Sequence, residues 1–151
     1  MTSAKWKDTA ELIGMAAIVA SLVLVAFELR QNTAVSTAQA VSDLNTAIDS
    51  AYRSRAQNSV LDELISKGHS DPDTLTEQER SQFFTWLHAD MNLIEAAWFY
   101  YDNRIIPERK FDGYKNAACS RVTSRGGREY WVADAKFFAR DFRESIEEWC
   151  L

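Results

Sequence analysis

The sequence predicts an all-α protein in which an N-terminal transmembrane helix continues into a bundle of about four helices. Apolar residues recur at helical spacing along most of the chain, and no segment shows the alternation of a half-buried strand. Near the N-terminus, sixteen consecutive residues, Leu12–Phe27, carry no charge. We therefore expect two parts: residues 1–30, with the tail and the membrane helix, and residues 31–151, which form the bundle.

The uncharged run has the composition of a membrane span. Ser21 is its only polar residue, whereas a helix that covers a soluble core keeps a polar face. Extended to Ala10–Leu29, the run reaches about 30 Å, the thickness of the hydrocarbon core of a bilayer. A signal peptide needs a small-residue cleavage site soon after Phe27, but the chain continues Glu-Leu-Arg-Gln-Asn. We favour a transmembrane helix, and the alternative is a fully buried helix of a soluble protein.

Small residues line one face of this expected span. Spacings of four, three and four residues place Ala10, Gly14, Ala17 and Ser21 on one stripe, and Glu28 lies on it seven residues later. Small side chains let helix backbones approach closely in lipid, where packing drives association. The stripe indicates a homo-oligomer or a membrane-protein partner, although Ala and Gly are also common in isolated spans.

A helix can continue beyond the span, because neither Pro nor Gly occurs between Met15 and Lys67. A narrow apolar seam with the spacing of a coiled coil follows, formed by Val41, Leu44, Ile48 and Ala51. A new helix is expected to begin near Asn58-Ser59, where Ser59 forms a weak capping box with Asp62. Gly68 is expected to end this helix before the loop "HSDPD".

The longest helix of the bundle is expected to begin at Thr76. Thr76 and Glu79 form a capping box, and no helix breaker follows before Pro107. One face of this helix is apolar at helical spacing: Phe83, Leu87, Met91, Ile94, Trp98 and Tyr101. The next helix covers Pro107–Val122, with a proline at its start. Gly126-Gly127 is expected to break the chain. The inner face of the last helix then holds Trp131, Phe138, Phe142, Ile146 and Trp149.

Two short motifs carry a resemblance to a known family: "ELRQNT" (Glu28–Thr33) and "GGREYW" (Gly126–Trp131). The chain resembles an uncharacterised bacterial family with a short N-terminal span that ends in Gln/Glu-x-Arg-Gln-Asn-Thr and a helical domain that closes with Gly-Gly-Arg-x-x-Trp. The resemblance implies a single-pass protein of the inner membrane and brings no catalytic residues. Arginines that usually follow the signature in that family imply a cytoplasmic domain, but the corresponding stretch here, "AVSTAQA", has none.

The residues alone favour the opposite orientation. Lys5 and Lys7 precede the span, and only Arg30 follows it closely, so the positive-inside rule favours an N-terminus in the cytoplasm. We give more weight to the topology that the family implies and expect a cytoplasmic domain.

The sequence lacks the motifs of common enzymes. It has no Glu-x-x-His or His-x-x-x-His pair, no phosphate-binding glycine loop and no Gly-x-Ser-x-Gly elbow. We expect His69 in a loop and His88 hydrogen-bonded or facing solvent, although Asn92 and Glu95 on the same row could in principle hold a metal. With 22 acidic against 17 basic residues, the net charge of −5 argues against nucleic acid. We therefore expect neither an enzyme nor a cofactor.

One segment is strongly basic. Between residues 104 and 128, two acidic residues, Glu108 and Asp112, accompany seven basic ones: Arg104, Arg109, Lys110, Lys115, Arg121, Arg125 and Arg128. Such a segment near a bilayer can contact anionic lipid, and a solvated face that balances the acidic helices is the alternative.

The two cysteines, Cys119 and Cys150, are too few for a disulfide framework. We expect two reduced thiols, because a single bridge would form only in an oxidising compartment. The aromatic stretch Ala96–Arg104 is expected to be buried between two neighbouring helices, with a binding cleft as the alternative.

Two functions remain from the sequence. The first is a membrane-anchored structural or interaction protein, which self-associates or serves as an accessory subunit of a larger membrane complex. The alternative is a membrane-tethered, ligand-sensing helical domain that uses the aromatic stretch as its pocket. In both, the lipid bilayer is a partner.

Overall fold

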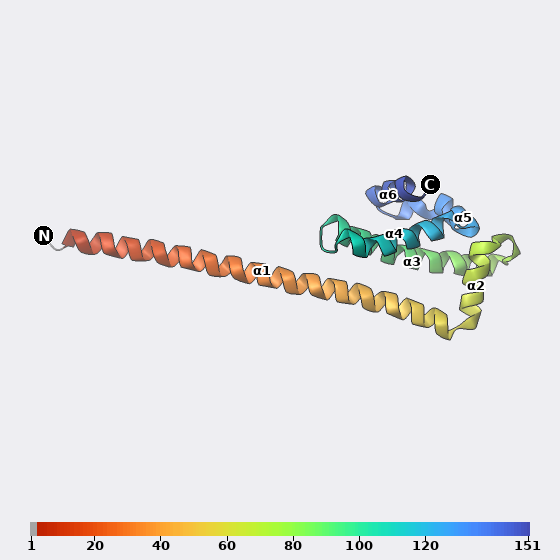
Figure 1. Ribbon diagram of the computed structural model, residues 1–151, viewed down its shortest axis with the longest axis horizontal. Coiled ribbons are helices and arrows are strands. Elements are labelled where there is room, and N and C mark those ends of the chain that lie inside the picture. The colour runs from red at the N-terminus through yellow and green to blue at the C-terminus, as the bar shows by residue number, and fades with distance from the viewer. Residues whose placement is uncertain (1–2) are drawn as a thin grey trace. The chain divides into compact units, whose positions relative to one another are not determined.

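The computed structural model describes the backbone of residues 3–151 and the side chains of residue 11 and of residues 13–151. Within these residues the chain is all-α and has no strand, which confirms the predicted fold class (Figure 1). The elements in order are α1 (Ser3–Gln57), α2 (Ser59–Ser70), the 3₁₀ turn η1 (Pro72–Thr74), α3 (Glu77–Asp102), α4 (Glu108–Thr123), α5 (Arg125–Asp134), the 3₁₀ turn η2 (Ala135–Phe137) and α6 (Arg140–Cys150). The chain divides into two compact units, one ending at Ala40 and one covering Val41–Leu151, and α1 contributes to both.

In the first unit, α1 carries the apolar run with its side chains exposed. Within Ile13–Gln57, the most apolar stretch of 18 residues has a mean hydropathy of 2.0, and none of that stretch is buried within the protein. The hydroxyl of Ser21 donates a hydrogen bond of 2.9 Å to the backbone carbonyl of Ala17, so the helix satisfies this polar group without water. By length and composition, α1 is able to cross a bilayer.

In the second unit, the remainder of α1 packs through the seam that the sequence predicts. Leu44 is buried, and Val41 and Ile48 pack against the same cluster. The other buried members of this cluster are Ala97, Ile106 and Phe111. The seam therefore packs onto its own helical domain.

The helix α2 starts where the sequence predicts, but its N-cap and its end differ from the prediction. Asn58, and not Ser59, is the N-cap, because its Oδ1 accepts a hydrogen bond of 3.1 Å from the backbone N–H of Leu61. The helix continues past Gly68 to Ser70, so His69 is helical and does not lie in a loop. Gly68 is buried, and a Cβ there would lie 2.3 Å from the ring of Phe83. This glycine therefore serves close packing and does not end the helix.

The capping box at the start of α3 is confirmed. Thr76 and Glu79 exchange the reciprocal hydrogen bonds of that motif, and the helix runs to Asp102. The predicted apolar face is buried as far as Ile94, after which the fully buried residue is Ala97. Buried residues of α3 form the main core together with residues of the other helices and of the segments between them, namely Leu64, Leu75, Ala118, Val122, Tyr130, Trp131, Phe138, Phe142 and Ile146.

Gly126 and Gly127 lie in the first turn of α5, so the predicted break at this pair is wrong. The chain turns at Ser124, whose Oγ caps α5 by accepting a hydrogen bond of 3.1 Å from the N–H of Gly127. A Cβ on Gly126 would lie 2.0 Å from the carbonyl oxygen of Gly68. The two glycines therefore allow α5 to approach α2 and the end of α4 closely. The last predicted helix is in fact two, α5 and α6, separated by η2.

The expectation of two reduced thiols is also wrong. Cys119 of α4 and Cys150 at the end of α6 form a disulfide, with their Cα atoms 4.9 Å apart. The disulfide follows from the packing of α4 against α6. No local pattern in the sequence predicts this packing.

Candidate functional site

The helical domain contains a cavity of about 310 Å³ bounded by α1, α3 and α4. Its wall is formed by Ile48, Ala51, Tyr52 and Arg55 of α1, by Trp86, Asp90, Leu93 and Ile94 of α3, and by Lys110, Gly113, Tyr114, Ala117 and Arg121 of α4. All of these residues belong to the unit Val41–Leu151. The volume lies at the lower end of the range for small-molecule sites.

The cavity exists because small residues occupy positions where three helices meet. Ala51, Gly113 and Ala117 contribute little volume to the wall. A Cβ added at Gly113 would meet no heavy atom within 4 Å, so this glycine faces open space. At the same time α3 and α4 pack directly against each other, for example through the stacked rings of Tyr101 and Phe111, 4.5 Å apart. The space is therefore left between this pair and α1.

Aromatic and aliphatic side chains make up most of the wall. Trp86, Tyr52 and Tyr114 provide the rings, and Leu93 and Ile94 the aliphatic surface. Burial first, and then the neighbouring Tyr52, raise the pKa of Tyr114 above its ordinary value. A cavity with such walls favours an apolar ligand body.

One end of the cavity carries a half-buried ion pair. The Nε of Arg121 donates to a carboxylate oxygen of Asp90, and both side chains are 17% exposed. Nη1 of Arg121 donates a further hydrogen bond of 3.1 Å to the carbonyl oxygen of Ala117. Burial alone would lower the pKa of Arg121, but hydrogen bonds and charge interactions with Asp90 and Tyr52 together outweigh it and raise the pKa. Arg55 at the same end pairs with Asp62.

The charged side chains at this end of the cavity affect the protonation of His69. Its ring lies edge-on to Trp86 at 5.9 Å between centroids, and its Nδ1 lies 2.8 Å from Oγ of Ser124. Burial first, and then the charges of Arg121 and Arg55, lower the pKa of His69, while Asp90 acts in the opposite direction, and the net result is a pKa of about 4. His69 is therefore neutral at pH 7, beside a locally positive group of side chains.

Folding stability should fall as the pH drops from about 6.5 towards 4. In this window the unfolded chain protonates His69 while the folded chain does not, so protons favour unfolding. Because His69 is partly exposed, solvent screening reduces the effect, and we expect a loss of about 1 kcal/mol between pH 7 and pH 5. The measurement is the free energy of unfolding at several pH values. A His69→Gln variant should show a flatter profile, and an unchanged profile would contradict the neutral histidine.

Lys110 differs from Arg55 and Arg121, the other two cations of the wall, each of which is paired with a carboxylate. It is exposed, and among the described residues it forms no ion pair. It lies eleven residues before Arg121 on α4, which corresponds to about 16 Å along the helix axis. The cavity thus has two guanidinium–carboxylate pairs at one end and an unpaired cation at the other end.

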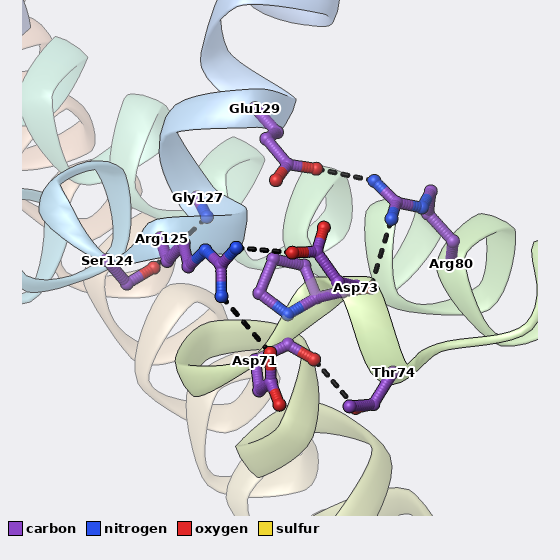
Figure 2. Close-up of polar contacts among 9 residues, drawn as sticks. Asp71, Asp73, Thr74, Arg80, Ser124, Arg125, Gly127 and Glu129 are labelled. Carbon is purple, nitrogen blue, oxygen red and sulfur yellow. Dashed lines mark hydrogen bonds and ion pairs between the residues drawn. The ribbon is translucent and has the colours of Figure 1, made fainter.

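The basic residues between positions 104 and 128 do not form one continuous patch of free charge in the structure, because several of them are paired. Arg121 is paired with Asp90, and Nζ of Lys115 lies 4.9 Å from the ring centroid of Trp149. Arg125 donates to Asp71 and Asp73, which ties α5 to the loop before α3 (Figure 2). The remaining members are exposed, namely Arg104, Arg109, Lys110 and Arg128. Contact of these residues with anionic lipid stays a prediction.

The aromatic stretch does not line the cavity. Trp98 packs against Phe142, with the ring centroids 5.7 Å apart, and belongs to the surroundings of both core clusters. The cavity lies along a different part of α3, at Trp86, Asp90 and Leu93. The sequence did not predict the cavity, because the space depends on the small size of residues such as Gly113 and Ala117. No recognisable motif marks them. His88, in contrast, is hydrogen-bonded as expected, with its Nδ1 2.8 Å from the hydroxyl of Tyr130.

The small-residue stripe lies on α1 in the first unit. Gly14, Ala17, Ser21 and Glu28 are all exposed, whereas the side chain of Ala10 lies outside the described residues. A Cβ on Gly14 would meet nothing within 4 Å. Self-association through this stripe therefore stays a prediction.

No protein-family model, no curated protein and no solved structure matches this chain. The resemblance carried by "ELRQNT" and "GGREYW" stays a prediction.

Proposed function

We propose that this chain is a membrane-anchored binding protein, in which the apolar run of α1 anchors a helical domain that binds a small molecule and works as a sensor. The cavity of about 310 Å³ carries this proposal, because it combines apolar walls with a few polar groups. One of its walls belongs to α1, the same helix that carries the apolar run. Binding at that wall would act directly on the helix that enters the membrane.

The orientation we propose places the helical domain on the oxidising side of the membrane. The disulfide between Cys119 and Cys150 supports this side, because such bonds persist in oxidising compartments. Lys5 and Lys7 before the span and the single Arg30 close behind it support the same side. The cytoplasmic placement, by contrast, rests on the topology that the family resemblance implies.

An engineered surface thiol tests this orientation. Val132 is 88% exposed, so Val132→Cys places a thiol on the surface of the helical domain. A membrane-impermeant maleimide should modify it rapidly in intact cells. Modification only after the cells are permeabilised would place the domain in the cytoplasm.

The binding function can be tested by filling the cavity. Gly113→Leu projects a side chain into open space, so it should block a ligand without disturbing the fold, and Gly113→Ala is the matched control. Full-length protein in nanodiscs of zwitterionic lipid is screened against small molecules by thermal unfolding. A ligand at about a hundred times its Kd should stabilise the wild type by about 2.7 kcal/mol. The leucine variant should not respond. A library that shifts both proteins equally, or neither, would argue against a binding function.

A second candidate function is self-association through the membrane helix. Its motivation is the stripe of Gly14, Ala17 and Ser21 on an exposed apolar helix. The carboxylates of Glu28 would converge in such an assembly, so each needs a cationic or amide group of a neighbouring chain. This function is compatible with ligand binding in the helical domain.

Gly14→Leu should disrupt such an assembly strongly, because the larger side chain keeps the backbones apart. Glu28→Gln should change it mildly, because the amide keeps the shape of the side chain. The measurement is chemical cross-linking of the full chain in native membranes, with Leu22→Ile as a control substitution elsewhere in the run. If Gly14→Leu leaves the cross-linked species unchanged, the stripe is not an interface.

A further inference from the structure

The charges on the wall of the cavity are unequal. Three basic residues, Arg55, Lys110 and Arg121, face one acidic residue, Asp90. Arg121 is matched by Asp90, and Arg55 is matched by Asp62, which lies outside the wall. Among the described residues, Lys110 has no such partner. The uncompensated charge of the cavity is therefore a single ammonium group at one end.

The surface between the two ends is apolar and open. Along α4, Gly113, Tyr114 and Ala117 separate Lys110 from Arg121. Trp86 and Leu93 of α3 line the cavity together with α1, whose wall residues extend over about 10 Å from Ile48 to Arg55. The volume corresponds to about ten water molecules. A body the size of a fused ring pair or a medium-length alkyl chain fits these dimensions.

The geometry points to a small amphipathic monocarboxylate as the ligand of this cavity, with its carboxylate at Lys110 and its apolar body along Gly113, Tyr114 and Trp86. This inference rests on the proposed function, because it names the ligand class of the same cavity. One carboxylate is expected and not two, since the guanidinium groups at the far end are already paired. The Lys110 ammonium, which has no carboxylate partner in the part of the chain that the structure describes, is the group that distinguishes an acid from its neutral analogue.

The test compares an acid with its neutral isostere. Isothermal titration calorimetry measures the binding of 1-naphthaleneacetate and of 1-naphthaleneacetamide to the full chain in nanodiscs of zwitterionic lipid. The acid should bind the wild type about tenfold more tightly than the amide, as a charge-assisted hydrogen bond allows. Gly113→Leu should abolish the binding of both probes, and any heat that remains measures their partition into lipid.

Two matched lysine and arginine variants locate the carboxylate. Lys110→Gln should weaken binding of the acid about tenfold and leave the amide unchanged. Arg109→Gln removes an adjacent exposed charge that does not line the cavity, and it should change neither affinity.

Three outcomes would overturn this assignment, and they bear differently on the binding function. If acid and amide bind equally to the wild type and Gly113→Leu blocks both, the cavity binds ligands but does not select carboxylates. If neither probe binds the wild type more tightly than Gly113→Leu, the assignment is wrong, and the broader library screen decides whether the binding function falls with it. An equal loss from Lys110→Gln and Arg109→Gln would reduce the effect to general attraction of anions.

Discussion

Gly126→Ala should destabilise the helical domain by about 3 kcal/mol, at the upper end of the range for overpacked cores. The new Cβ would lie 2.0 Å from the carbonyl oxygen of Gly68 and 3.0 Å from the ring of Phe83. A backbone oxygen inside a helix cannot turn away as the end of a side chain can, so α2 and α5 must separate. The measurement is thermal unfolding of the full chain, followed by circular dichroism.

Gly113→Ala is the matched control for this substitution. The same change is made in another helix, but the new methyl group meets nothing within 4 Å. Alanine is the better helix former, so the control should gain about 1 kcal/mol. Equal effects of the two substitutions would show that Gly126 is not in close contact with α2.

Removal of the disulfide should cost about 3.5 kcal/mol. Cys119 and Cys150 are 31 residues apart, and in the chain-entropy model a crosslink over a loop of this length restricts the unfolded state by that amount. For a domain of this size the loss corresponds to a fall in Tm of about 10–15 °C. The double variant Cys119→Ala/Cys150→Ala avoids a lone reactive thiol.

Reduction provides an internal control for the disulfide prediction. A phosphine reductant should lower the Tm of the wild type to that of the double variant and leave the double variant unchanged. A wild type whose Tm does not respond, and which carries two thiols that react with an alkylating agent under native conditions, would contradict the bridge.

Local signals in the sequence accounted for much of the fold. The capping box of Thr76 and Glu79 depends on residues three positions apart, and the structure has it as expected. Leu44 and Ile48 follow a spacing that any helix turns to one side, and both pack in the helical domain. Each of these features is set by neighbours in the sequence.

The mistaken predictions involve partners that are distant in the sequence. A pair of glycines ends a helix in one setting and allows a close helix contact in another. At Gly126 the choice is made by Gly68, which lies 58 positions earlier in the chain. The disulfide likewise depends on how α4 meets α6. The cavity forms where three helices place small residues around the same space. No single segment of the sequence shows that these residues come together.

The most direct test of a ligand site in the cavity is native mass spectrometry of the full chain released from the membranes of cells that express it. The wild type and Gly113→Ala should carry a small-molecule adduct, and Gly113→Leu should lack it because its side chain occupies the cavity. The three proteins should have the same oligomeric state. If the wild type and Gly113→Leu carry the same adducts, or if the wild type carries none, the cavity is not a ligand site and the proposed function is wrong.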